Sequence, residues 1–116
     1  MSESEHYATT ETVHADFSIY FRDRRVAGSR EAIELREYYN GRALTPIYYF
    51  APAMLAELEA RPSEHTTFCP IKGHTRYWHF GDAENVIWSY PEPIVGVAAI
   101  RDHVAFDTFG GFRIAR

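Results

Sequence analysis

The sequence lacks the motifs that mark several common kinds of site. Its single cysteine, Cys69, excludes an intramolecular disulfide, and no CxxC pair is present of the kind that structural zinc sites use. Neither a GxxxxGK[ST] loop nor a GxGxxG turn occurs, so the two common phosphate-binding signatures are missing. We therefore predict no metal site and no cofactor.

Positive charge and long apolar stretches are also scarce. Twelve basic residues against sixteen acidic ones give a formal net charge of -4, the wrong sign for binding nucleic acid through its phosphates. The longest apolar runs, residues 48–55 and 94–100, are each under half of the roughly 20 residues that span a bilayer. The first dozen residues are acidic and polar, unlike a signal peptide. We expect a soluble, cytoplasmic protein with no nucleic-acid or membrane partner.

What remains is the composition of one globular domain. The 116 residues are 46% hydrophobic and 16% aromatic, and a chain of this length buries roughly two thirds of its unfolded surface. We predict a disordered N-terminal tail over residues 1–14 and a single β domain over residues 15–116.

Apolar and polar residues alternate along most of the chain, which is typical of β-strands. The pattern predicts a hairpin over residues 17–26, interrupted after it by Gly28-Ser29-Arg30. It predicts further strands at residues 33–37, 45–50, 67–70, 74–80, 86–90, 104–107 and 112–114, with a turn at Asn40-Gly41. One helix is expected at residues 53–60, after Pro52. We predict a mainly β fold, a small antiparallel barrel-like domain with one short helix.

The most informative motif is Cys69-Pro70-Ile71-Lys72-Gly73, because it holds the only cysteine and the only lysine of the chain. A retained lysine among eleven arginines suggests a task for a compact, titratable charge. Pro70 and Gly73 favour a tight loop that can bring thiol and amine together. An ammonium nearby favours the reactive thiolate, and burial turns a lysine into a candidate base or nucleophile. The alternative is a small buried Cys69 and a surface Lys72.

Aromatic side chains are dense on either side of this motif. The candidate ligand-binding residues are Tyr49, Tyr77, Trp78, Trp88 and Tyr90, together with Gly73. They either wall a pocket or simply pack the core.

Glu37 follows Ile33 and Leu35 in the strand alternation and is expected to turn inward. An inward carboxylate needs a cation or hydrogen-bond donors, and Lys72 is one candidate. The alternative is an exposed residue at a strand end. The candidate catalytic residues are Cys69, Lys72 and Glu37.

Several blocks occur in an order that matches a known family. They are Val26-Ala27-Gly28-Ser29, Leu35-Arg36-Glu37, Tyr48-Tyr49-Phe50-Ala51-Pro52, Thr66-Thr67-Phe68-Cys69-Pro70-Ile71-Lys72-Gly73, Tyr77-Trp78, Trp88-Ser89-Tyr90-Pro91-Glu92-Pro93 and Val104-Ala105-Phe106. Together they closely resemble the bacterial domain of unknown function 427, over residues 17–114. The CP-x-KG core beside W-x-Y-x-x-P is its specific part.

The resemblance implies a small mainly β fold similar to the β-tent class of methionine sulfoxide reductase B, with a cleft near the motif. The family is also labelled nucleotidyltransferase-like. Gly28-Ser29 matches the Gly-Ser turn of that signature, but no Asp/Glu-x-Asp/Glu pair follows at a suitable distance to bind Mg²⁺. Ala51 stands where the family often has proline directly after the phenylalanine.

The residues predict a domain that binds a small molecule in a cleft around the CPIKG loop, and whether it is an enzyme stays open. One alternative is a non-catalytic interaction or self-association module, for which a homodimer is expected. Thiol-based redox sensing through Cys69 and the nucleotidyltransferase-like activity of the family label are further alternatives.

Overall fold

The computed structural model describes residues 5–116. Its elements are mainly antiparallel strands arranged in one small domain, as predicted. The sheets do not close into a barrel. Among residues 5–116 no helix is both long enough and apolar enough to cross a membrane.

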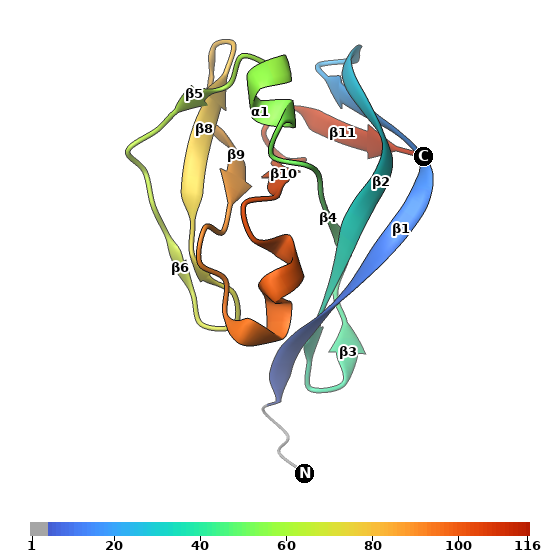
Figure 1. Ribbon diagram of the computed structural model, residues 1–116, viewed down its shortest axis with the longest axis vertical. Helices are drawn as coiled ribbons and strands as arrows, with labels where there is room; N and C mark the ends of the chain where they lie inside the picture. The colour runs from blue at the N-terminus through green and yellow to red at the C-terminus, as the bar shows by residue number, and fades with distance from the viewer. Residues whose placement is uncertain (1–4) are drawn as a thin grey trace.

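The first sheet is built on one long hairpin. Strands β1 (His6–Phe21) and β2 (Arg24–Tyr39) pair antiparallel along almost their whole length. The turn between them uses Arg22 and Asp23, both with positive φ. Strand β11 (Phe112–Ala115) adds to β1, and the short strands β3 (Arg42–Ala43) and β4 (Ile47–Tyr49) add to β2. Figure 1 shows this curved sheet on the right of the molecule.

The second sheet has the order β10-β9-β8-β5. Its strands are β5 (Arg61–Pro62), β8 (Arg76–Phe80), β9 (Ala83–Ser89) and β10 (Val104–Phe106). A separate two-stranded ladder joins β6 (Phe68–Cys69) to β7 (Gly73–His74). The backbones of Phe50 and Val104 exchange two hydrogen bonds of 2.8 Å, which link the two sheets at one point.

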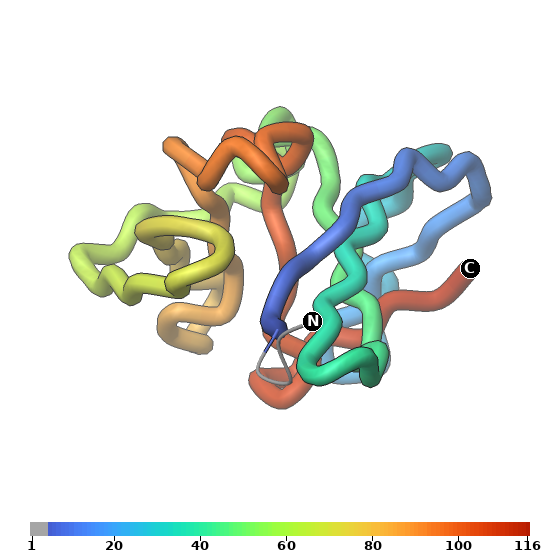
Figure 2. Tube along the Cα trace, turned by 90° about the horizontal axis from the view of Figure 1, so that it is seen from below, coloured from blue at the N-terminus to red at the C-terminus, as the bar shows by residue number. Residues whose placement is uncertain are grey.

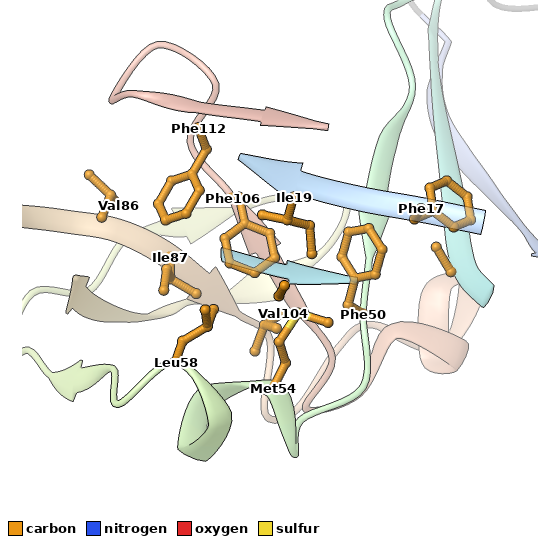
Figure 3. Packing of buried hydrophobic residues seen from close by; sticks show 12 residues of the cluster. Phe17, Ile19, Phe50, Met54, Leu58, Val86, Ile87, Val104, Phe106 and Phe112 are labelled. Atoms are coloured by element: carbon orange, nitrogen blue, oxygen red, sulfur yellow. The ribbon is translucent and has the colours of Figure 1, made fainter. Parts of the chain in front are cut away.

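The core between the sheets consists of two clusters. The larger one is rich in phenylalanine, with Phe50 packed between Phe17 and Phe106 (Figure 3). Helix α1 (Met54–Glu57) covers it with Met54 and Leu58. The smaller cluster lies beneath the 3-10 helix η1 (Val95–Ile100) and includes Tyr49 and Tyr90. Figure 2, a view from below, shows η1 beside β1, and the two elements are in contact.

The prediction of a disordered tail over residues 1–14 is wrong from His6 onward; residues 1–4 lie outside the described part of the chain. His6 to His14 pair with Tyr39 to Glu31 of β2. This polar segment is held by backbone hydrogen bonds to β2. Because its side chains show no alternation of apolar and polar residues, the sequence pattern did not predict a strand here.

The predicted interruption at Gly28-Ser29-Arg30 is also wrong, because β2 continues through it. The pairing register shifts there instead, between His14 and Phe17 on β1. Such a β-bulge perturbs the alternation without ending the strand.

Two other elements differ from their predicted extents. The helix expected at residues 53–60 spans only Met54–Glu57, since Glu59 takes positive φ and the chain turns into β5. The strand expected at residues 74–80 is divided at Thr75 into β7 and β8.

Candidate functional site

The CPIKG motif forms a tight hairpin. The Lys72 amide donates a 3.1 Å hydrogen bond to the Cys69 carbonyl, and Pro70 occupies the second turn position, where its fixed φ is favourable. Cys69 then pairs with Gly73 across the β6–β7 ladder. Pro70 and Ile71 therefore form the tip of the turn, and Lys72 is its last residue, directly before Gly73 of β7.

This hairpin is docked onto the segment that follows β9. The Ile94 amide donates to the Lys72 carbonyl at 3.0 Å. Gly73 has a φ of +116°, and a β-carbon there would lie 3.0 Å from the Glu92 carbonyl oxygen. Glycine thus permits both the turn and the close approach to Glu92.

Lys72 is buried, with 7% of its surface exposed, and it is not the surface charge of the alternative interpretation. Its ammonium donates to Glu37 Oε1 at 3.3 Å and lies 5.8 Å from the centre of the Tyr90 ring. Glu37 comes from β2, where it shares a face with Ile33 and Leu35 as the alternation predicted. Two residues from opposite sides of the molecule therefore form one ion pair.

His6 is the third member of this charge group, and sequence reasoning missed it. His6 pairs with Tyr39 across β1 and β2, so Glu37 is its diagonal neighbour on the same face. His6 Nε2 lies 2.6 Å from Glu37 Oε2. The threonines that follow His6 favour a strand and were the available signal.

Aromatic side chains surround the ion pair. Trp88 Nε1 donates to the Tyr49 hydroxyl at 3.3 Å, and the Tyr49 and Tyr90 ring centres are 6.4 Å apart. Burial raises the pKa of both phenols, so both remain protonated donors. We call Glu37, Lys72, His6, Tyr49, Tyr90, Trp88 and Cys69 the polar cluster.

Cys69 lies within this cluster but does not bond to the amine. It is partly buried and packs against the apolar groups around Tyr49 and Tyr90. The hydrogen bonds of residues 5–116 include none between the Lys72 ammonium and the Cys69 thiol, and the ammonium reaches Glu37 instead.

Two predicted ligand-binding residues lie at or beyond the cluster's edge. The Tyr77 hydroxyl bonds to Thr67 Oγ1 at 3.0 Å. Trp78 packs against the larger, phenylalanine-rich core instead. Neighbouring residues of a strand point to opposite faces, so Tyr77 and Trp78 cannot line the same site.

The polar cluster is mostly buried, with Tyr49, Tyr90 and Lys72 each at most 7% exposed. Two surface depressions, of about 450 and 330 Å³, lie on the β1–β2 hairpin. Neither is lined by Glu37, Cys69 or Lys72, although Tyr49 borders the smaller one. Within residues 5–116, no three His, Cys, Asp or Glu side chains gather closely enough to hold a metal ion.

The comparison with models of protein families gives a match. The family model NTP_transf_9, described as "Domain of unknown function (DUF427)", matches residues 9–110. The chain belongs to this family. No curated protein matches the chain. The DUF427 match begins at Thr9, inside β1, and therefore includes residues 9–14 of the predicted tail.

We expect Gly73→Ala to cost roughly 1–3 kcal/mol of unfolding free energy, because alanine is strained at this φ and its β-carbon crowds Glu92. Urea denaturation measures the loss. The matched control is Gly41→Ala, which has a φ of +79° and open space around the new β-carbon. An equal loss in both variants would show that docking onto Glu92 contributes nothing.

A second prediction concerns acid stability. Burial raises the pKa of Glu37, but the hydrogen bond to His6 and the charge of Lys72 outweigh it and lower the pKa below its ordinary value of 4.5. A lowered pKa stabilises the folded state above that value, and the stabilisation disappears as the pH falls below it. Glu37 titrates roughly between pH 5 and pH 3. Over this range the free energy of unfolding is therefore expected to fall more in wild type than in Glu37→Gln. Parallel pH curves for the two proteins would contradict this.

Proposed function

We propose that this domain binds a small molecule at the polar cluster, through an oxygen acceptor such as a carboxylate or carbonyl group. The observation that carries the proposal is the buried Lys72–Glu37 pair, enclosed by aromatic rings. Ligand sites generally combine apolar and aromatic walls with a few placed polar groups. The CPIKG loop would then contribute Lys72 to the binding site, in line with the role predicted for it. We also propose a cytoplasmic location.

The donors of the cluster support an acceptor group on the ligand. An ammonium has three N–H donors, and within residues 5–116 the Lys72 ammonium uses one, on Glu37. Among residues 5–116 the Tyr90 hydroxyl makes no hydrogen bond to another side chain, and its raised pKa keeps it protonated. It is therefore a second donor for an oxygen of the ligand.

We infer that a ligand would enter beside the end of β1. Glu37 keeps 20% and His6 32% of side-chain exposure, whereas the Lys72 side chain keeps 9%. A ligand that approaches along His6 and Glu37 meets the ammonium behind them. Gly73 and Trp88 hold this arrangement by docking the loop and by orienting Tyr49.

Thermal shift with a panel of small carboxylic and keto acids tests the proposal. Wild type is expected to be stabilised by a subset of the panel, as binding to the folded state requires. Tyr90→Phe removes only the hydroxyl and is expected to weaken that shift. Tyr38→Phe, which alters a phenol stacked on Tyr7 at the strand surface, is the control. Shifts that Tyr90→Phe leaves unchanged would contradict the proposed site.

Exposed apolar residues favour one other function, a self-association module. Val95 on η1 and Phe109 in the turn before β11 are almost fully exposed, and contact of either with a second copy would remove apolar surface from water. Light scattering over a range of concentrations separates the two functions. A dimer that Phe109→Ser dissolves, together with no ligand-induced shift, would favour the module.

A further inference from the structure

The β1–β2 hairpin carries a second candidate site, far along the strands from the polar cluster. A hollow of about 450 Å³ lies where the two strands change register, and its polar lining includes Asp16, Ser18, Arg25, Gly28, Ser29 and Arg30. We call it the bulge hollow. Its volume falls within the range of ligand pockets, roughly 300–1,000 Å³.

Two register shifts produce the hollow. One lies between His14 and Phe17, and the other lies between Ile19 and Tyr20. At the first, Ala15 and Asp16 together face Arg30, and at the second, Val26 is the extra residue on β2. Bulges bend a strand and redirect its side chains. Here they bring arginines from both sides of Gly28 to one hollow.

The Arg25 guanidinium is positioned by one side-chain hydrogen bond, through Nε. Its Nε donates to Ser18 Oγ at 3.2 Å. Its Nη2 occupies the space where a β-carbon on Gly28 would stand, and its Cζ is 3.3 Å from that position. Hydrogen bonds from Arg25 to the described residues involve Nε alone, so the four N–H groups on the two Nη atoms are available to a ligand.

The charge at the hollow is positive, against a net charge of -4 for the whole chain. Arg25 and Arg30 bring two positive charges, and Asp16 brings one negative charge. Arg30 and Asp16 are 4.0 Å apart and almost fully exposed, so their attraction is weak and easily exchanged. Arg30 is thus free to turn to another anion.

We propose that the bulge hollow binds a phosphate group, either free phosphate or the phosphate of a small phosphomonoester. A guanidinium fork matches two phosphate oxygens at once, and a tetrahedral anion leaves further oxygens for the second arginine. Gly28 has its role here as the residue that leaves room for the guanidinium of Arg25. The proposal stands independently of the one for Lys72 and Glu37.

A titration of the ¹⁵N-labelled protein with inorganic phosphate at low ionic strength tests it. Saturable shifts are expected for the amides of Gly28 and Ser29. Arg25→Met is expected to weaken phosphate binding about tenfold or more. Gly28→Ala should have a similar effect, because its β-carbon displaces Nη2, the far end of a flexible side chain. Arg42→Met removes an equal charge from β3 and serves as the control.

Three results would overturn the assignment. The first is an equal phosphate affinity in Arg25→Met and Arg42→Met. The second is a set of amide chemical-shift changes spread over all exposed arginines. The third is that acetate changes the chemical shifts of Gly28 and Ser29 as much as phosphate does. Glycerol phosphate beside inorganic phosphate distinguishes the two sources, since tighter binding of the ester assigns the hollow to a phosphorylated small molecule. The spectra also report folding, and Arg30→Met repeats the test if Arg25→Met does not fold.

Discussion

Glu37→Leu is expected to lower the free energy of unfolding by about 3 kcal/mol, because it leaves the buried ammonium of Lys72 without its counter-charge. The value lies at the lower end for buried pairs, since the Glu37 side chain retains 20% exposure. Urea denaturation at pH 7 measures the loss.

Two further variants separate the ion pair from other effects of leucine. Glu31→Leu makes the same change on the same strand at a carboxylate with 64% side-chain exposure, and it is expected to cost less than about 0.5 kcal/mol. The double variant Glu37→Leu, Lys72→Met is expected to recover most of the stability, because neither charge is then stranded. If the double variant is less stable than Glu37→Leu, the ion pair is not the cause.

Phe50→Ala is expected to be the most destabilising single change, at about 3–5 kcal/mol. The Phe50 side chain has no exposed surface and packs against Phe17 and Phe106 with ring centres 5.5 and 5.8 Å away. Its truncation leaves a cavity where the two sheets meet. Because its backbone is bonded to Val104, the position cannot easily shift to fill that cavity.

The change in unfolding free energy on denaturation measures this effect. Phe109→Ala is the matched control, since the Phe109 ring is fully exposed and its removal creates no cavity. The control is expected to stay within about 0.5 kcal/mol of wild type. Similar losses for Phe50→Ala and Phe109→Ala would mean that the junction between the sheets contributes little to stability.

Alternating residues made most strands of this fold predictable. Ile33 and Leu35 marked the buried face of β2, and Asn40-Gly41 marked the turn after it. The segment from His6 to His14 could not be found in this way, because backbone pairing stabilises it and its side chains show no apolar period. The bulge near Gly28 was misleading for a related reason, since an inserted residue reverses the alternation within a continuous strand.

The candidate site was predictable where one residue type was unique or one face was defined. Lys72 is the only lysine, and Glu37 shares the face of Leu35, so composition and period made Lys72 one candidate partner for an inward Glu37 without selecting it. The part played by His6 depends on strand register, which no local pattern encodes. The burial of the cluster depends on how η1 and the Glu92–Ile94 segment approach it, and neither position follows from local sequence.

The pairing of β1 with β11 joins Ser18 to Ala115, nearly the full length of the chain. Synthesis delivers β1 long before its partner, so the edge formed by Ser18 to Phe21 has no neighbour until residues 112–115 have also been made. Contacts between such distant segments also slow folding. During synthesis this edge of β1 is therefore unpaired. In that interval a chaperone or another strand can occupy the place that β11 later takes.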